Sequence, residues 1–160
     1  MIIKFENISS LSHEKTICVP GCFDLFHIGH VNLFKKIKKE FPNFKLVVAV
    51  SSDETIKRKK GKLRPIISGK DRVDMINSCK YVDYVYSSPT FEDNFENRQI
   101  LRIKDLRPDY LVYENLNNIE EINKIEELGT QIIELKSENT THTSETVSYT
   151  HLRAHETRHD

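Results

Sequence analysis

From Thr16 onward, short apolar runs alternate with amphipathic segments, and this alternation restricts the fold more than any other feature of the chain. The run from Lys45 to Val50 is almost entirely apolar, which is typical of a central strand in a parallel sheet. Strands that alternate with helices predict βαβ units, in which helices cover both faces of a mainly parallel sheet. We therefore expect an α/β fold of three layers, α/β/α, with five strands.

The expected elements follow from the hydrophobic spacing and from the residues that start and stop helices. Strands are expected at 16–20, 45–50, 84–86, 110–113 and 131–135, and helices at 31–41, after 51–53, and at 68–79, 95–106 and 119–128. Gly129 is placed to cap the last helix at its C-terminus. The basic stretch from Lys57 to Pro65, with its Gly and Pro, predicts an exposed loop. Residues 1–15 are expected to be an N-terminal appendage.

Composition excludes several classes of protein. The chain has 160 residues, the length of one ordinary domain. Its 24 basic and 24 acidic side chains give no net charge, so a nucleic-acid partner is not expected. No apolar run reaches the roughly 20 residues of a membrane span, and no secretory signal is present. Three cysteines without a CxxC pair suit a reducing compartment, so we expect a cytoplasmic protein without membrane insertion.

The last fourteen residues have a composition unlike the rest and show neither a strand nor a helix pattern. Back-translated, Val147 to Thr157 can be spelled by DNA that resembles the transposon mosaic end and adapter used to build sequencing libraries. We therefore expect the native domain to span 16–146, its C-terminal helix truncated, and 147–160 to be adapter read-through. The rival is a natural His-rich metal tail, and resequencing the source locus distinguishes the two.

The run Gly-Cys-Phe-Asp-Leu-Phe-His-Ile-Gly-His, residues 21–30, lies between the first expected strand and helix, where phosphates meet helix N-termini in open α/β sheets. Gly21 lets the backbone approach a ligand, and Gly29 leaves the first N–H groups of the helix free. His27 and His30 stand three residues apart, which places both imidazoles on one side of a helical turn. They can therefore donate hydrogen bonds to a phosphate and to a leaving pyrophosphate.

Structural or metal-binding roles are the rival interpretations of these residues. A histidine pair at this spacing could be structural or could bind zinc. Cys18 and Cys22 could share a metal, although nothing supplies further ligands. The complete ten-residue run favours the phosphate-binding interpretation, and no protein metal site is expected.

This run resembles the HxGH signature of the cytidylyltransferase-like nucleotidyltransferases, and the resemblance extends over about 16–144. It implies a Rossmann-like fold, a nucleotide site that includes Gly21, Cys22, Phe23, Asp24 and Gly29, and catalytic roles for His27 and His30. Asp24 would order the loop and the nearby ligand. The literal letters HIGH also occur in class I aminoacyl-tRNA synthetases, but the chain is far too short for one.

Further stretches resemble the same family. Lys60, before Gly61, matches the family's flexible lysine loop and would reach the phosphates. Arg72 matches an arginine-bearing helix and would contact phosphate or the second substrate; a surface salt bridge is its rival interpretation. Thr143 and Ser144 loosely match the family's Ile-Ser-Thr-Thr run, whose hydroxyls and N–H groups hold phosphates. The stretch 113–118 departs from the family's glycine-rich turn, which leaves the base and the acceptor open.

The resemblance implies transfer of CMP or AMP from CTP or ATP to a phosphorylated sugar or alcohol, with Mg²⁺ carried by the triphosphate and pyrophosphate released. The stretch 57–65 resembles heptose 1-phosphate adenylyltransferases, whereas the chain's size also suits glycerol-3-phosphate or ethanolamine-phosphate cytidylyltransferases. Relatives are commonly dimers, so a homodimer is expected. The alternatives are an inactive nucleotide-binding regulatory module and an α/β domain without a nucleotide site.

Overall fold

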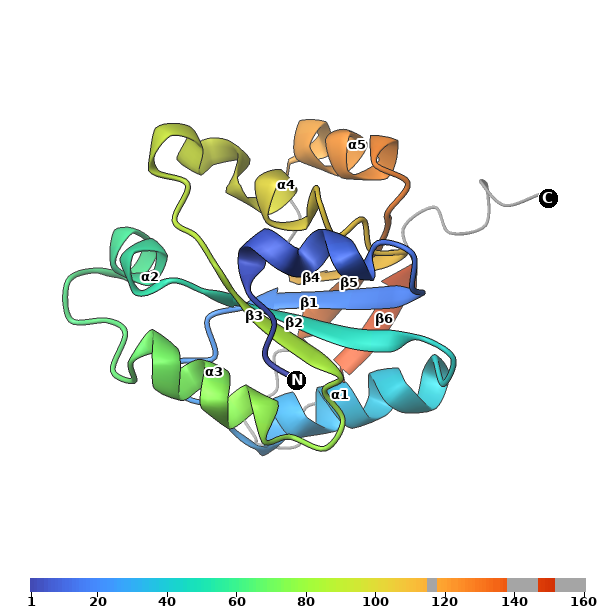
Figure 1. Cartoon of the computed structure of the whole chain (residues 1–160), viewed down its shortest axis with the longest axis horizontal. Coiled ribbons are helices and arrows are strands. Elements are labelled where there is room, and N and C mark those ends of the chain that lie inside the picture. The colour runs from blue at the N-terminus through green and yellow to red at the C-terminus, as the bar shows by residue number, and fades with distance from the viewer. Residues whose placement is uncertain (115–117, 138–146, 152–160) are drawn as a thin grey trace.

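The computed structural model of the chain describes residues 1–114, 118–137 and 147–151, which form one sheet between two layers of helices (Figure 1). Its parallel strands are β1 (Thr16–Gly21), β2 (Lys45–Ser51), β3 (Tyr84–Ser88), β4 (Tyr110–Glu114) and β5 (Gln131–Ser137). A further strand, β6 (Val147–His151), pairs antiparallel with β5. The expected α/β fold with a mainly parallel sheet is confirmed, and β6 adds an edge strand to the five that were expected.

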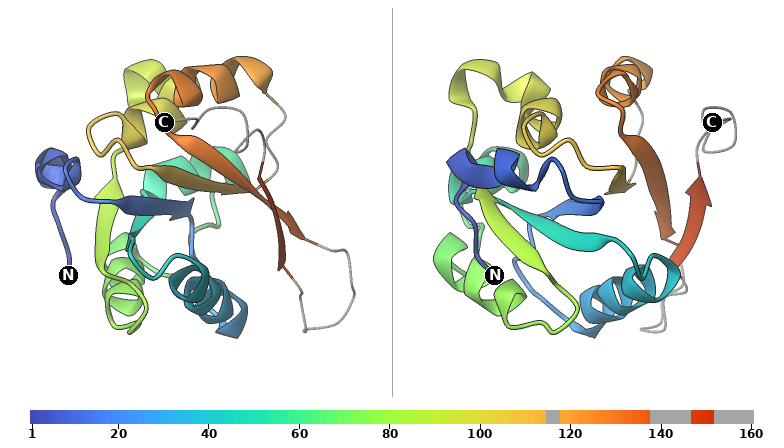
Figure 2. Two further views of the ribbon diagram at one scale, coloured as in Figure 1. Left: turned by 90° about the vertical axis from the view of Figure 1, so that its right-hand side faces the viewer. Right: turned by 45° about the vertical axis from the view of Figure 1, so that its right-hand side comes forward.

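The helices divide between the two faces of the sheet (Figures 1 and 2). One face is covered by α1 (Ile28–Glu40) and α3 (Gly69–Asn77), and the other by α4 (Arg98–Ile103), α5 (Ile119–Glu127) and the 3₁₀ helix η1 (Phe5–Leu11). Two short helices follow the carboxyl ends of strands: α2 (Asp53–Lys60) follows β2, and the 3₁₀ helix η2 (Glu92–Asn97) follows β3. This arrangement places α2 and η2 at the edge where ligands bind in open α/β sheets.

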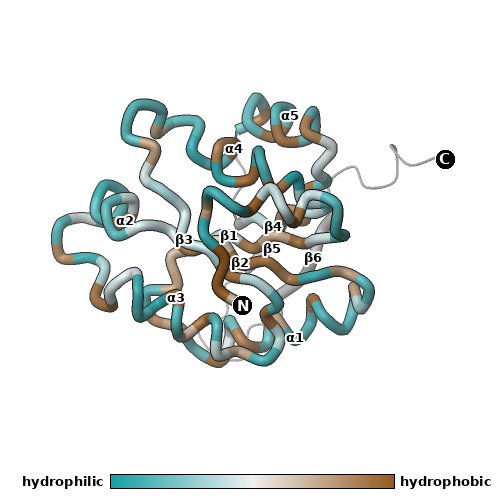
Figure 3. The backbone as a smooth tube through the Cα atoms, in the orientation of Figure 1, coloured by the Kyte–Doolittle hydropathy of each residue, from teal (hydrophilic) through white to brown (hydrophobic). Residues whose placement is uncertain are grey.

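Strand β2 is apolar throughout because it contributes to two cores. Successive side chains of a strand point to opposite faces. Leu46 and Val48 accordingly join the core under α1 and α3, whereas Val47 and Ala49 join the core under α4 and α5. In Figure 3 the backbone of β2 is mostly brown, the colour of hydrophobic residues, whereas the helices alternate between hydrophilic and hydrophobic residues.

The strand order β3-β2-β1-β4-β5-β6 creates a switch point beside β1. The chain runs outward from β1 through β2 to β3, then crosses the sheet to β4 and runs outward again to β5. The connections on the two sides therefore leave opposite faces of the sheet, and in open α/β sheets ligands bind at such a switch point, here the carboxyl ends of β1 and β4. The segment that follows β1 is residues 21–30, so the fold brings the HxGH run to this switch point.

The first fifteen residues pack against the domain. Ile2 forms a parallel bridge with Val85 of β3, so the N-terminal segment covers that edge of the sheet. Ile8 and Leu11 of η1 are 0% and 4% exposed in the core under α4 and α5. Backbone pairing and apolar burial give this segment a structural role that its sequence did not reveal.

Two local elements differ from the sequence prediction. Residues 57–60 form the last turns of α2, not a loop, because Ser52 caps a helix that continues until Gly61, at φ +100°, ends it. Residues 147–151 form β6, although their sequence lacks a strand pattern. An edge strand needs only backbone partners, and β5 presents them, so side-chain alternation is not required. The origin proposed for 147–160 stays a prediction.

Candidate functional site

The turn after β1 is shaped by Gly21 and Phe23. Phe23 has a φ of +52°, a left-handed conformation that turns the chain sharply after the strand. Its ring folds back over Gly21, where an added Cβ would lie 2.7 Å from the ring. The same ring packs at 5.3 Å between centroids against His30, and it is 7% exposed. Gly21 is therefore required for the position of the Phe23 ring, which packs against His30.

His27 and His30 cap the N-terminus of α1 with their ring nitrogens. His27 Nδ1 accepts a hydrogen bond of 3.0 Å from the Gly29 N–H, and His30 Nδ1 accepts one of 3.1 Å from the His27 N–H. The two rings stack with centroids 3.9 Å apart, as the three-residue spacing predicted. A Cβ on Gly29 would lie 2.7 Å from His27 Cε1. The motif's second glycine therefore makes room for the first histidine.

These caps determine where the neutral imidazoles carry their protons. A ring nitrogen that accepts a hydrogen bond holds no proton, so the neutral form of each ring is protonated on Nε2. His30 is half-buried against Phe26, whose ring it stacks on at 5.5 Å. Burial, and then the charge of His27, lowers the pKa of His30 from 6.5 to about 4. At neutral pH, His30 is therefore an uncharged hydrogen-bond donor.

The lowered pKa of His30 predicts an acid-sensitive component of stability. In the unfolded chain this ring takes up a proton near pH 6.5, but in the folded chain only near pH 4. The unfolded state thus binds more protons in this window, so the stabilisation is present above pH 6.5 and is lost as the pH falls to 4. In urea unfolding between about pH 7 and pH 4, His30→Asn should lose less stability than the wild type. Equal losses would contradict the burial argument.

Asp24 fastens the loop between α2 and α3 to the β1 turn. Its carboxylate is 3% exposed and accepts hydrogen bonds from the N–H groups of Ile66 (2.8 Å) and Ile67 (2.9 Å). The guanidinium of Arg64 forms an ion pair of 2.6 Å with the same carboxylate. Burial alone would raise the pKa of Asp24, but the two N–H donors and the charge of Arg64 lower it below its usual 3.8. Asp24 therefore orders the loop as an anion.

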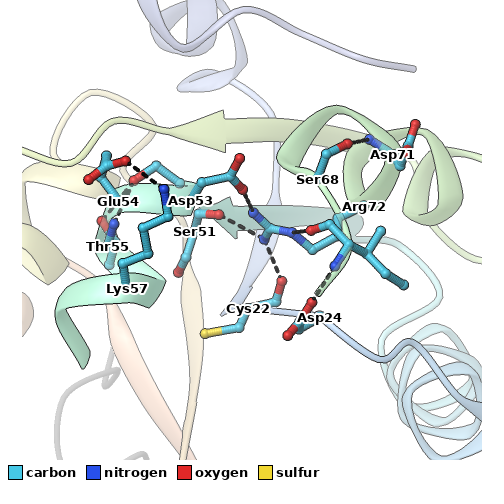
Figure 4. Close-up of polar contacts among 12 residues, drawn as sticks. Cys22, Asp24, Ser51, Asp53, Glu54, Thr55, Lys57, Ser68, Asp71 and Arg72 are labelled. Carbon is cyan, nitrogen blue, oxygen red and sulfur yellow. Dashed lines mark hydrogen bonds and ion pairs between the residues drawn. The ribbon is translucent and has the colours of Figure 1, made fainter. Parts of the chain in front are cut away.

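Arg72 joins four segments at the carboxyl edge of the sheet (Figure 4). Its side chain is fully buried. Nη1 donates to the carbonyls of Cys22 (2.7 Å) and Ser51 (2.8 Å), Nη2 pairs with Asp53 Oδ1 (2.6 Å), and Nε donates to the Ile67 carbonyl (3.0 Å). All of these partners are protein groups, and the guanidinium is not on the exposed face of α3. Direct contact of Arg72 with a phosphate stays a prediction, and it would require these bonds to be exchanged.

The structure gives less information about the remaining predicted residues. Lys60 is exposed in the last turn of α2, directly before Gly61. Cys22 is half-buried. In the sequence it lies between Gly21, the last residue of β1, and Gly29, in the first turn of α1. Thr143 and Ser144 lie outside the described residues, as do residues 115–117 of the divergent turn. The structure therefore brings together the residues of 21–30 and Arg72, and the catalytic and nucleotide-binding roles of all the predicted site residues stay predictions.

Sequence reasoning missed a second basic group at the same edge. Arg102 of α4 is 3% exposed and donates to the hydroxyls of Ser51 and Ser88, the last residues of β2 and β3. The sequence signal that could have identified it is an arginine on the sheet-facing side of an amphipathic helix.

Within 1–114, 118–137 and 147–151, no group of three or more His, Cys, Asp or Glu could hold a metal ion. No helix in this part of the chain is long and apolar enough to cross a membrane.

Comparison with known proteins identifies the family. The cytidylyltransferase-like family matches residues 18–158. The chain belongs to this family. It is 42% identical over 112 residues to the bifunctional protein HldE of Helicobacter pylori strain 26695, an alignment that covers 69% of this chain and 23% of that protein. HldE of Campylobacter curvus is 36% identical over 107 residues. The chain thus spans less than a quarter of the length of these relatives.

Solved structures agree with this assignment. A lipopolysaccharide core biosynthesis protein from Thermoplasma volcanium superposes with a TM-score of 0.62 at 26% identity, covering 76% of this chain and 96% of that protein. A pantoate-beta-alanine ligase from Francisella tularensis, at 17% identity and a TM-score of 0.54, shares the fold alone, over 88% of this chain and 68% of its own. The resemblance predicted from the HxGH run and the Rossmann-like fold are both confirmed.

Proposed function

We propose that this cytidylyltransferase-like protein transfers AMP or CMP from a nucleoside triphosphate to a phosphorylated sugar or alcohol and releases pyrophosphate. The observation that carries the proposal is the cap of α1, where both histidines accept backbone N–H groups through Nδ1 and keep Nε2 as a donor. Donors fixed before the substrate arrives stabilise charge that develops in the transition state without reorganising.

The reaction needs positioning and charge neutralisation more than covalent catalysis. An oxygen of the acceptor's phosphate attacks the α-phosphorus, and the bond from that phosphorus to the bridging oxygen breaks. Pyrophosphate then leaves with the bonding electrons. The Nε2–H groups of His27 and His30 would donate to the α-phosphate and to the leaving oxygen. Mg²⁺ would enter with the triphosphate, bound to its oxygens.

The acceptor is proposed to be a sugar phosphate. The stretch 57–65 resembles heptose 1-phosphate adenylyltransferases, and the relatives include HldE proteins and a lipopolysaccharide core biosynthesis protein. Lipopolysaccharide cores are built from sugars, which favours a sugar over glycerol or ethanolamine. A cytoplasmic homodimer is the form proposed, because nucleoside triphosphates are available there and relatives commonly dimerise.

A two-stage measurement tests the function. ATP or CTP with Mg²⁺ should raise the melting temperature, because a ligand that binds only the folded state stabilises it. Pyrophosphate release should then appear with one pair from a panel of both nucleotides with heptose 1-phosphate, glycerol 3-phosphate and ethanolamine phosphate. Stabilisation without release from any pair would favour a nucleotide-binding regulatory module. The absence of both responses would reject a nucleotide site.

A further inference from the structure

Residues 89–97, which connect β3 to α4, hold α2 at both of its ends. At the N-terminal end, Thr90 Oγ1 shares a hydrogen bond of 2.7 Å with Oγ of Ser52, the residue that caps α2. Near the C-terminal end, the guanidinium of Arg58 stacks over the Phe95 ring, 4.0 Å from its centre. Two attachments determine both the position and the direction of a helix of eight residues. The placement of α2 therefore depends on residues 89–97.

The segment 89–97 needs support from outside itself. Phe91, which precedes η2, has φ +55° and ψ +53°, a left-handed conformation that a bulky residue adopts only where its surroundings hold it. The helix η2 lies within the described residues 1–114, and none of its six side chains is buried there. A segment with so few apolar contacts of its own opens easily unless a neighbour holds it.

Phe5 of the N-terminal segment supplies this support. Its ring packs edge-on against the Phe91 ring, with centroids 5.6 Å apart, and against the Tyr86 ring at 6.0 Å. Tyr86 of β3 is fully buried, and its hydroxyl donates a hydrogen bond of 2.9 Å to the Arg102 carbonyl. Phe5 thus connects the ring that precedes η2 to a fixed residue of the sheet. Such aromatic pairs stabilise beyond the area that they bury.

Phe5 is itself anchored on both sides. Before it, the Ile3 N–H donates to the Val85 carbonyl at 2.9 Å, and the Val85 N–H donates to the Met1 carbonyl at 3.0 Å. After it, Ile8 and Leu11 are buried in the core under α4 and α5. The N-terminal segment therefore holds the Phe5 ring at one place beside β3.

The helix that this chain of contacts fixes carries Lys60. Thr55 and Ile56 of α2 are 1% and 0% exposed, so the inner face of the helix is packed into the domain. Lys60 is exposed in the last turn, at the end of α2 that the stacking of Arg58 on Phe95 holds. A long side chain binds a phosphate more tightly when its backbone is already ordered, because less freedom is lost on binding.

We propose that Phe5 is a positioning residue, which acts through Phe91 and the segment 89–97 to fix α2 and so to hold Lys60 where the triphosphate binds. This inference rests on the proposed function and on the role predicted for Lys60. Phe5 would touch no substrate. Residues 1–11 would then contribute to nucleotide affinity as well as to the core.

Phe5→Ala tests the positioning role by separating nucleotide affinity from stability. It should raise the KM for the nucleotide roughly three- to tenfold, the range expected when one aromatic pair is lost, whereas Phe5→Tyr should keep it within about twofold. Leu11→Ala is the matched control in η1. It should lower the melting temperature at least as much, because it leaves a cavity in the core, yet keep the nucleotide KM within about twofold. Ile8→Val is the milder control if Leu11→Ala does not fold.

Hydrogen exchange measures the same link without turnover. Phe5→Ala should speed exchange of the amides of 53–60 and 90–97 relative to those of β2, and Leu11→Ala should not. Equal acceleration in both variants, or an unchanged nucleotide KM in an active Phe5→Ala enzyme, would overturn the positioning role and leave the proposed function intact. If no acceptor supports pyrophosphate release, the dissociation constant of ATP or CTP with Mg²⁺, taken from the thermal shift, replaces the KM. A dissociation constant that Phe5→Ala raises and Leu11→Ala does not would then reject the transfer and support the positioning role.

Discussion

Replacing His30 with asparagine is expected to lower kcat for pyrophosphate release by roughly 100- to 1,000-fold, the effect of removing one preorganised donor from a transition state. The fold should persist. The amide oxygen of asparagine lies near the position of Nδ1, so it can still accept the 3.1 Å hydrogen bond from the His27 N–H. What asparagine lacks is the Nε2–H group on the far side of the ring. The variant therefore separates catalysis from helix capping.

His30→Gln is the matched variant, because its amide nitrogen reaches the position of Nε2 while the cap at Nδ1 is lost. It should retain more activity than His30→Asn and lose more stability, by about 1 kcal/mol in urea unfolding, as expected for a lost N-cap contact. The two variants must therefore rank in opposite orders for kcat and for the free energy of unfolding. If asparagine proved as active as histidine, His30 would be structural and its Nε2 would contact no reacting group.

The three layers of the fold and the HxGH motif could be predicted from the sequence because both depend on local patterns of residues. The apolar run of β2 indicates a strand covered on both faces, and residues 21–30 contain the glycines and histidines of the HxGH signature. Each pattern is visible within ten residues. The contacts of Asp24 were less accessible, because its partners Ile66 and Ile67 are 42 and 43 residues away and donate through backbone groups that carry no residue-specific signal.

Arg72 and Arg102 show the limit of reading charge from sequence. On an amphipathic helix a charged residue is expected at the solvent, so Arg72 suggested either a phosphate ligand or a surface salt bridge. In the structure both arginines are buried because unpaired carbonyls and hydroxyls at the strand ends accept their hydrogen bonds. These acceptors lie next to one another only after β1, β2 and β3 have paired in the sheet. No local sequence pattern therefore predicts them.

Arg72→Met is expected to destabilise the protein by about 3–5 kcal/mol, as when one partner of a buried charged network is removed. Methionine fills much of the volume but donates no hydrogen bonds. The carbonyls of Cys22, Ser51 and Ile67 then lose their donor in a buried setting, where each unsatisfied group costs about 1–3 kcal/mol. The Asp53 carboxylate contributes less, because its side chain is 42% exposed and water can replace the guanidinium.

The comparison variant is Lys70→Met on the same helix, whose side chain is 85% exposed and pairs with Asp74. Its free energy of unfolding should change by no more than about 0.5 kcal/mol, because exposed ion pairs contribute little. Measured without nucleotide, the difference between the two variants isolates the internal bonds of Arg72. A phosphate ligand would behave in the reverse way: Arg72→Met would then keep the melting temperature and raise the KM for the nucleotide. Because all of Arg72's observed partners belong to the protein, we expect the melting temperature to fall first, and nucleotide binding to weaken as Cys22 and Ile67 lose their anchor.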